Sequence, residues 1–272
     1  KSGKIKNNYN IKGKILNTEL KIPKNKNIKE LNFNFHITDK NYKLEKIIFK
    51  FNQIKFNSEL IQIKQKNEKF YVNGNLKSKK GKINNDIILL MFNNNFENFD
   101  FSNSKFDSNS EFTFYLSKKL KIKNLKIDSK LNLEELILKY DLYKIKNYIK
   151  NYDNLINLKK NKIHVKYSEK KILIDGISEF YIEKDLKNLL NFKIEKYKNS
   201  TNFETFFNLQ NIDLKFDDIS YRKIKKKSAT LQIKGFEKKG TIIFKEANYN
   251  DNNNKIEINN LTINNNKILN IE

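Results

Sequence analysis

Cysteine and tryptophan are absent from this chain of 272 residues, and proline and methionine occur once each. Without cysteine the chain forms no disulfide and offers no thiolate to a metal or a substrate, although this absence leaves the redox compartment open. The two histidines, His36 and His164, stand alone on the polar positions of alternating segments. We therefore expect both imidazoles at the surface and no dedicated zinc site, because such a site takes about four ligands.

Glycine is scarce as well, with seven residues in the whole chain. A phosphate-binding loop or a dinucleotide fingerprint needs several glycines at fixed spacing, and neither pattern occurs. No serine lies in a nucleophile elbow. The adjacent carboxylates Glu134–Glu135 and Asp217–Asp218 point to opposite faces if they lie in strands, so they do not form a shared acid–base pair. The sequence predicts a protein that is not an enzyme and binds no cofactor.

Long apolar runs are also missing. The longest is Ile87–Phe92, far shorter than the roughly 20 residues of a membrane-spanning helix. The chain starts at Lys1 with no initiator methionine and no signal-peptide pattern. We expect an internal fragment of a longer protein, with any membrane anchor outside it.

Arginine is nearly absent, since Arg222 is the single arginine among 55 basic residues. The net charge of +24 thus comes from lysine, and the abundance of lysine and asparagine is typical of an AT-rich genome. A cationic surface attracts phosphate whatever its origin. The basic clusters 77–82, 118–123 and 222–227 flank strands or turns. Because arginine is the preferred reader of base edges, nucleic-acid binding is disfavoured but stays open.

Apolar residues alternate with polar ones along most of the chain, which is the pattern of a half-buried strand. The clearest segment is 28–38, where Leu31, Phe33, Phe35 and Ile37 alternate with asparagine and histidine. Similar segments cover 70–76, 112–116, 120–122, 131–133, 163–167, 172–174, 212–216, 229–233 and 256–258. Lysine-, asparagine- and glycine-containing turns separate them at roughly 8–14 residues, as in an antiparallel meander.

Two segments show helical spacing instead. From 140 to 158 apolar residues recur every three or four positions, and Lys184–Leu190 does the same over a shorter length. The sequence therefore predicts an N-terminal β block at 1–135, a short amphipathic helical insert at 136–160, and a C-terminal β block at 161–272 that continues the same sheet.

The order and spacing of strand and turn residues resembles the AsmA-like bacterial envelope proteins, the group of AsmA, TamB and YhdP. The segments that carry this resemblance are Ile212–Tyr221, Ala229–Gly235, Gly240–Phe244 and Lys255–Leu261. Similar sequences of strand and turn residues recur at Phe70–Leu76, Leu125–Leu133, Leu155–Ile163 and Ile172–Gly176. The likeness is one of strand and turn style over most of the chain, and no residue matches a functional residue of the family.

The resemblance implies an all-β, extended antiparallel meander, curled into a groove-like (taco-shaped) sheet with one or two short helices. It implies a non-enzymatic periplasmic segment that carries phospholipid between the inner and outer membranes, in a protein anchored in the inner membrane. The acyl chains would lie against the apolar face of the sheet, lined by Phe33, Phe35, Phe112, Phe114, Leu214 and Phe216. Three alternatives stay open: an ordinary sandwich core made by the same residues, a module that binds nucleic acid or another anion, and a surface adhesin.

Overall fold

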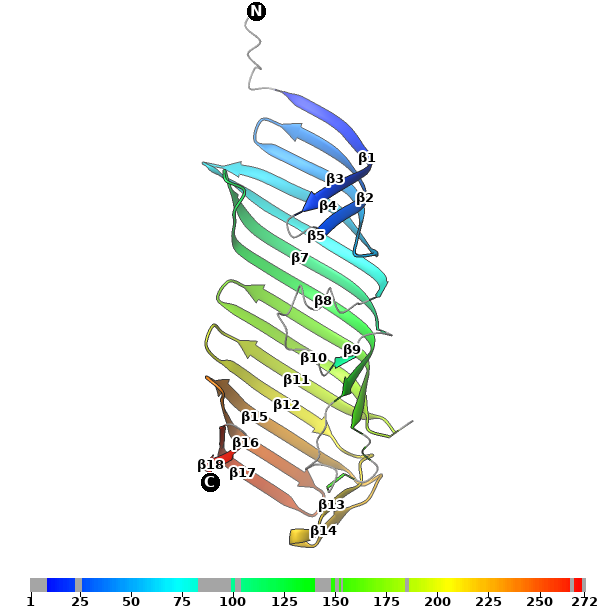
Figure 1. Ribbon diagram of the computed structural model, residues 1–272, viewed down its shortest axis with the longest axis vertical. Helices are drawn as coiled ribbons and strands as arrows, with labels where there is room; N and C mark the ends of the chain where they lie inside the picture. The colour runs from blue at the N-terminus through cyan, green and yellow to red at the C-terminus, as the bar shows by residue number, and fades with distance from the viewer. Residues whose placement is uncertain are drawn as a thin grey trace, which may run out of the picture. The chain divides into compact units, whose positions relative to one another are not determined.

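The computed structural model describes residues 9–22, 26–82, 99–100, 104–139, 148–149, 152, 154–183, 186–264 and 267–270. Nearly all of these residues lie in β-strands (Figure 1). In the described ranges the helical structure is a single 3-10 turn, η1 (Asp217–Ile219). None of the helical structure in these ranges has the length and apolar character that crossing a bilayer requires.

The strands fall into an N-terminal and a C-terminal series. The first comprises β1 (Asn10–Ile22), β2 (Lys26–Thr38), β3 (Asn41–Phe51), β4 (Ile54–Lys66), β5 (Lys69–Lys82), β6 (Phe99–Asp100), β7 (Lys105–Ser117), β8 (Ile122–Lys139) and β9 (Leu155–Ser168). The second comprises β10 (Lys171–Tyr181), β11 (Asn188–Lys196), β12 (Thr201–Asn208), β13 (Leu214–Phe216), β14 (Tyr221–Lys223), β15 (Ala229–Lys238), β16 (Thr241–Asp251), β17 (Lys255–Asn264) and β18 (Lys267–Asn270).

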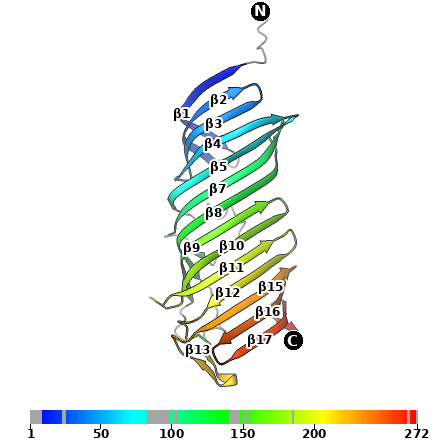
Figure 2. The ribbon, with the colours of Figure 1, turned by 180° about the vertical axis from the view of Figure 1, so that it is seen from behind.

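Sheet pairing follows the order of the chain. The main sheet runs β1-β2-β3-β4-β5-β7-β8-β9-β10-β11-β12-β15-β16-β17-β18, with β6 paired to β8, while β13 and β14 form a separate two-stranded sheet. Most successive strands of the sheet are joined by short turns, and they pair antiparallel, as the arrows in Figures 1 and 2 show. The first and last strands of this order do not pair with each other. The prediction of an all-β antiparallel meander is confirmed.

Many strands carry a bend of their own. A residue with positive φ lies inside each of β1, β2, β3, β5, β8, β9 and β17, namely Asn17, Glu30, Lys46, Lys80, Asn124, Lys160 and Asn260. Several of these positions coincide with register shifts, for example between Ser78 and Gly81 in β5. An extra residue in the left-handed conformation is a β-bulge, which bends its strand and increases its twist. We therefore expect these strands to bend locally at their bulges.

The predicted helices do not form where the structure describes them. Residues 136–139 end strand β8 and residues 155–160 begin strand β9, so the helical insert at 136–160 is wrong at both ends. The part from 140 to 147 lies outside the described residues. The second candidate, Lys184–Leu190, runs into strand β11, which starts at Asn188. The predicted blocks 1–135 and 161–272 both contribute strands to the one sheet.

The chain divides into two compact units. Unit 1 consists of Lys1–Lys82, Lys105–Leu131 and Val165–Glu169, and unit 2 consists of Ile83–Ser104, Asn132–His164 and Lys170–Glu272. They differ in how completely they bury apolar side chains. Of the twelve buried apolar side chains among the described residues, three (Ile47, Ile54 and Val72) belong to unit 1, and the other nine belong to unit 2.

Candidate functional site

The strand register of unit 1 aligns apolar residues into rows that cross the strands. Residues directly opposite each other on paired strands point to the same face of a sheet. One row is Gly13, Phe35, Leu44, Ile61, Gly74 and Phe112, and the next is Ile11, Ile37, Tyr42, Ile63, Val72 and Phe114. Both rows cross β1, β2, β3, β4, β5 and β7. We call the face that carries them the inner face.

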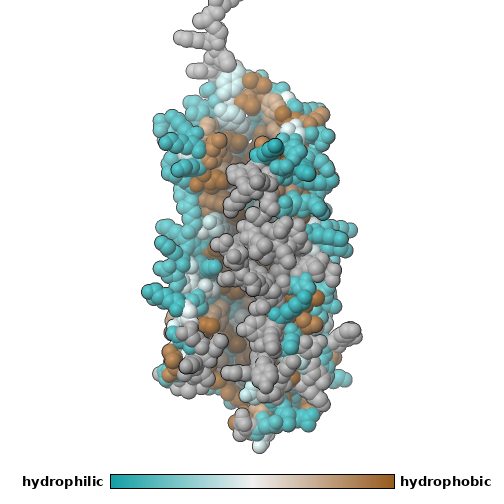
Figure 3. Space-filling model, viewed as in Figure 1, coloured by the Kyte–Doolittle hydropathy of each residue, from teal (hydrophilic) through white to brown (hydrophobic). Residues whose placement is uncertain are grey.

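Aromatic rings cover part of this face. The ring centroids of Phe33 and Phe35 lie 6.4 Å apart on β2, and those of Phe112 and Phe114 lie 6.0 Å apart on β7. Four of the sequence-predicted site residues therefore lie on the inner face of unit 1. Each of the four side chains is only partly buried. In Figure 3, hydrophobic side chains gather between hydrophilic rims where the atoms are coloured.

Glycines stand opposite phenylalanines on this face. The register pairs Gly13 with Phe35, Gly74 with Phe112, and Gly81 with Phe106. A Cβ atom placed on Gly74 would lie 3.0 Å from Cζ of Phe112, so the ring extends over the glycine. The pairing repeats in unit 2, where Gly176 faces Phe192 and Gly235 faces Phe203. The rings thus lie over the glycines of their neighbouring strands.

In unit 2 an insert covers part of the corresponding face. Residues 209–228 connect β12 to β15 and contain β13, η1 and β14. Leu209, Ile212 and Leu214 of this insert form one buried cluster with Phe180, Ala229 and Tyr249 of the main sheet. Leu214 is 7% exposed, and Phe216 packs against the same cluster. The prediction that Leu214 lines an open face is therefore wrong: protein covers this residue, and Phe216 belongs to the layer that covers it.

A buried lysine holds the insert in place. Lys223 is 1% exposed, and its Nζ donates hydrogen bonds to the carbonyl oxygens of Leu209 and Ile212, each at 2.8 Å, and of Gln210 at 3.2 Å. Desolvation lowers the pKa of Lys223, while Asp213 and Asp251 act in the opposite direction. A buried ammonium group is tolerated only when its N–H groups donate hydrogen bonds, and here the carbonyl oxygens of the insert accept them.

A pair of tyrosines, Tyr221 on β14 and Tyr249 on β16, also links the insert to the main sheet. The hydroxyl groups of Tyr221 and Tyr249 lie 2.6 Å apart, and the Tyr221 hydroxyl also donates to Asp251. The backbone N–H groups of Asn253 and Asn254 donate to the same carboxylate. Burial raises the pKa of both Tyr221 and Tyr249, so both stay protonated over the ordinary pH range. These hydrogen bonds join β14 of the insert to β16 of the main sheet.

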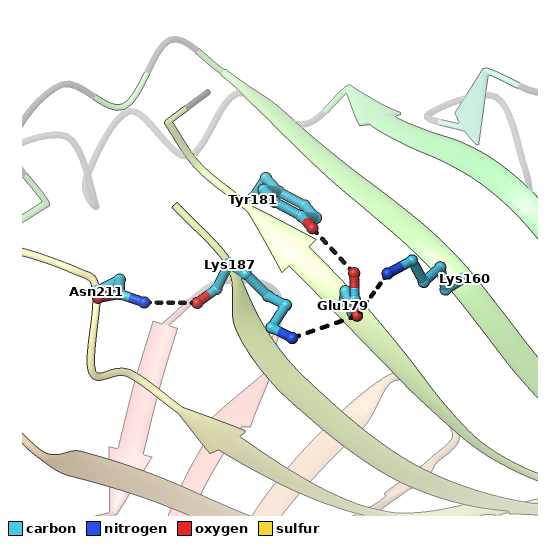
Figure 4. Close-up of polar contacts among 5 residues, drawn as sticks. All are labelled: Lys160, Glu179, Tyr181, Lys187 and Asn211. Carbon is cyan, nitrogen blue, oxygen red and sulfur yellow. Dashed lines mark hydrogen bonds and ion pairs between the residues drawn. The ribbon is translucent and has the colours of Figure 1, made fainter. Parts of the chain in front are cut away.

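One part of the outer face carries an ion-paired network. Figure 4 shows Glu179 of β10, which accepts hydrogen bonds from Tyr181 at 2.9 Å and from Lys160 at 3.2 Å, with Lys187 at 3.5 Å. Asn211 of the insert donates to the carbonyl of Lys187 at 2.7 Å. Desolvation raises the pKa of Glu179, but the hydrogen bonds from Tyr181 and Lys160 outweigh it, so this pKa lies below its usual value. Such a network ties β9 and β10 to the residue that precedes β11.

The histidines and paired carboxylates remain unconnected to any site. His36 contacts Asn10 at 2.8 Å, and His164 lies 3.6 Å from Asp175 on the neighbouring strand. No group of three or more His, Asp or Glu that could hold a metal ion occurs among the described residues. Sequence reasoning missed the opposed Gly–Phe pairs and the buried Lys223. The glycines within alternating segments were the available signal for the Gly–Phe pairs, since a glycine inside a strand often marks the close approach of another chain segment.

Comparison with known proteins adds no relative: no protein-family model, no curated protein and no solved structure matches this chain.

Proposed function

We propose that the inner face of unit 1 binds the acyl chains of phospholipids, and that this chain is a non-enzymatic lipid-carrying segment of an AsmA-like envelope protein. In this proposal the protein acts in the periplasm, and parts of it beyond this chain contact the inner and outer membranes. The observation that carries the proposal is the pair of apolar rows across six strands, whose aromatic side chains remain only partly buried.

The dimensions and energetics support this function. Six strands at a spacing of about 4.8 Å give a row of about 24 Å. A bilayer leaflet has an apolar thickness of about 15 Å, half of the hydrocarbon core, so an acyl chain fits along one row. Each methylene moved from water to an apolar surface contributes about 0.8 kcal/mol, and no directional chemistry is needed. The apolar surface to which the Gly–Phe pairs contribute suits a ligand that has no polar groups along its length.

Native mass spectrometry of the purified chain tests this function. We expect phospholipid to be retained by the unmodified chain and lost by Phe114→Glu, because a carboxylate on the inner face opposes burial of an acyl chain. Thr113→Glu is the matched control: it adds the same charge one residue away on β7, where the side chain points to the outer face. Equal lipid content in the two variants would contradict the proposal.

A milder pair of variants removes the risk that Phe114→Glu fails to fold. The chain has no cysteine of its own, so Phe114→Cys and Thr113→Cys each create a unique labelling position. A fluorophore at position 114 should be quenched by phospholipid with brominated acyl chains, and one at position 113 should not. Equal quenching at both positions would show that lipid binds without preference for the inner face.

A further inference from the structure

Positive charge is distributed unequally between the two units. Unit 1 contains 29 lysines against 10 acidic residues, a net charge of +19, whereas unit 2 contains 26 basic and 21 acidic residues, a net charge of +5. A compositional bias of the genome acts on the whole chain and does not explain a difference of this size. Concentrated positive charge favours an anionic partner for unit 1.

The turn between β7 and β8 concentrates this charge around an exposed apolar side chain. Residues 118–123 read Lys-Lys-Leu-Lys-Ile-Lys, with no acidic residue among them. Leu120 is 73% exposed, more than any other large apolar residue described, and Ile122 is 55% exposed. The neighbouring β4–β5 turn adds two lysines, Lys66 and Lys69, to this basic surface. The two turns lie close together, since Nζ of Lys118 is 3.1 Å from the carboxylate of Glu68 in the β4–β5 turn.

The backbone of this turn is held in one conformation. The N–H of Leu120 donates to the carbonyl of Ser117 at 2.8 Å, the N–H of Ser117 donates to the carbonyl of Lys121 at 3.0 Å, and the N–H of Lys121 donates to Oγ of Ser117 at 3.0 Å. Leu120 adopts a φ of 55°, a left-handed conformation that is unfavourable for a leucine. An ordered turn that keeps a strained leucine in water points to a role for the side chain outside the fold.

We propose that this turn docks unit 1 onto an anionic phospholipid surface. Leu120 and Ile122 enter the interface between headgroups and acyl chains, and Lys118, Lys119, Lys121 and Lys123 lie at the level of the phosphates. Lysine suits this arrangement because its apolar stem accompanies the leucine while the ammonium group stays in water. Reversible membrane attachment usually combines weak insertion of an apolar group with several basic residues that contact anionic headgroups. This proposal does not depend on lipid binding at the inner face.

Vesicle co-sedimentation of the full chain tests the docking surface. We expect binding to vesicles of phosphatidylcholine with about 30% phosphatidylglycerol, an anionic fraction that gives each nearby basic residue roughly a fivefold effect on affinity. Pure phosphatidylcholine vesicles should bind far more weakly. Lys118→Gln/Lys119→Gln should reduce binding by about 25-fold on the same scale. Lys238→Gln/Lys239→Gln removes equal charge from the β15–β16 turn of unit 2 and should change binding less than about twofold, because that turn lies outside the docking surface.

The variant Leu120→Gly separates docking from folding. Glycine accepts a positive φ without strain, so this variant should be at least as stable as the original chain. Its affinity for anionic vesicles should nevertheless fall about tenfold, because the apolar contact is lost. Phe114→Glu should keep vesicle binding, which distinguishes a failure of docking from a failure of the inner-face proposal.

Fluorescence gives an independent readout, since the chain contains no tryptophan. Leu120→Trp should show a blue shift with anionic vesicles, and Ile219→Trp, at an exposed position of η1, should not. Unchanged affinity in Leu120→Gly would overturn the proposal. So would an equal loss in both double-lysine variants, or binding of single-stranded DNA that depends on this turn while vesicle binding does not.

Discussion

At the scale of single residues, the contact between glycine and phenylalanine recurs across both units. A glycine in a strand usually weakens it, because backbone entropy is lost and no side chain packs. Here the opposing ring occupies the space above the glycine and covers its backbone. Five glycines lie opposite a phenylalanine in this way. The two residue types therefore act as one packing unit, and either substitution disturbs both strands.

Gly176→Ala tests this packing. The new Cβ would lie 2.6 Å from the carbonyl oxygen of Lys162 and 2.8 Å from Cζ of Phe192, so backbone and ring must both shift. Overpacking of this kind costs about 1–3 kcal/mol. We expect that decrease in the free energy of unfolding measured with urea. Gly240→Ser serves as the comparison, since nothing lies within 4 Å of its Cβ position and only the strain of its φ of 79° opposes the change. A neutral effect of Gly176→Ala would contradict the packing described.

At the scale of elements, the insert of unit 2 depends on Lys223. Lys223→Met keeps the length of the side chain and removes the ammonium group, which takes a donor from the carbonyls of Leu209, Gln210 and Ile212. The carbonyls of Leu209 and Gln210 keep their hydrogen bonds from the N–H groups of Ile212 and Lys226. Loss of a buried partner costs about 1–3 kcal/mol for each group left unsatisfied. We expect faster amide hydrogen exchange across residues 209–228, with little change in β10 and β11.

The neighbouring residue provides a matched control for this element. Arg222 precedes Lys223 on β14 and is exposed. Surface substitutions of this kind usually change stability by less than about 0.5 kcal/mol, so Arg222→Met should leave exchange in the insert unchanged. If Lys223→Met behaves like Arg222→Met, the ammonium group does not hold the insert.

The alternation of apolar residues is interrupted where a strand contains a bulge. In β9 the inner-face positions are Ile156 and Leu158 before Lys160, and Asn161 and Ile163 after it. The left-handed residue Lys160 shifts the alternation by one position within β9. The apolar residues spaced three or four apart lie at 140–158, before Lys160, so this bulge is not their cause, and those from Leu155 onward belong to β9. The period of two was reliable in segments without such a shift, as at Phe112–Leu116 of β7. Packing of the insert was not predictable, because it depends on contacts between distant parts of the chain.

At the scale of the whole molecule, carboxylates paired with lysine and tyrosine set the response to acid. Hydrogen bonds from Lys171, Tyr197 and Lys193 lower the pKa of Glu195 to about 2. The hydrogen bond from Lys77 lowers the pKa of Glu59. A carboxylate whose pKa is lower in the folded state stabilises the fold above its unfolded pKa, and this contribution is lost as the pH falls through the folded pKa.

We therefore expect the melting temperature to be constant above about pH 5 and to fall between about pH 4.5 and pH 2, where these groups become protonated. Glu195→Gln removes one titrating group, so the melting temperature of this variant should depend less steeply on pH in that interval. Differential scanning calorimetry across the interval measures the slope. An unchanged slope would show that Glu195 does not contribute to the acid response.

The all-β meander followed from alternation alone, because one apolar face imposes a period of two wherever a strand is regular. Alternation likewise predicted that Phe33, Phe35, Phe112 and Phe114 lie on an apolar face, while their role in binding lipid stays a prediction. Leu214 and Phe216 alternate in the same way, yet they cover the sheet of unit 2 instead of lining an open surface. Alternation identifies the apolar side of a strand and leaves open what that side packs against.

The bulge inside a strand has a consequence for how such a sheet can change over evolution. A bend encoded within each strand travels with that strand when its hairpin is duplicated or deleted. Gaining or losing a hairpin would then alter the number of strands in the sheet without requiring compensating changes in the strands that remain. Selection could then adjust the length of the sheet by copying hairpins. It could adjust the bend of a strand separately, by moving a single left-handed residue along that strand.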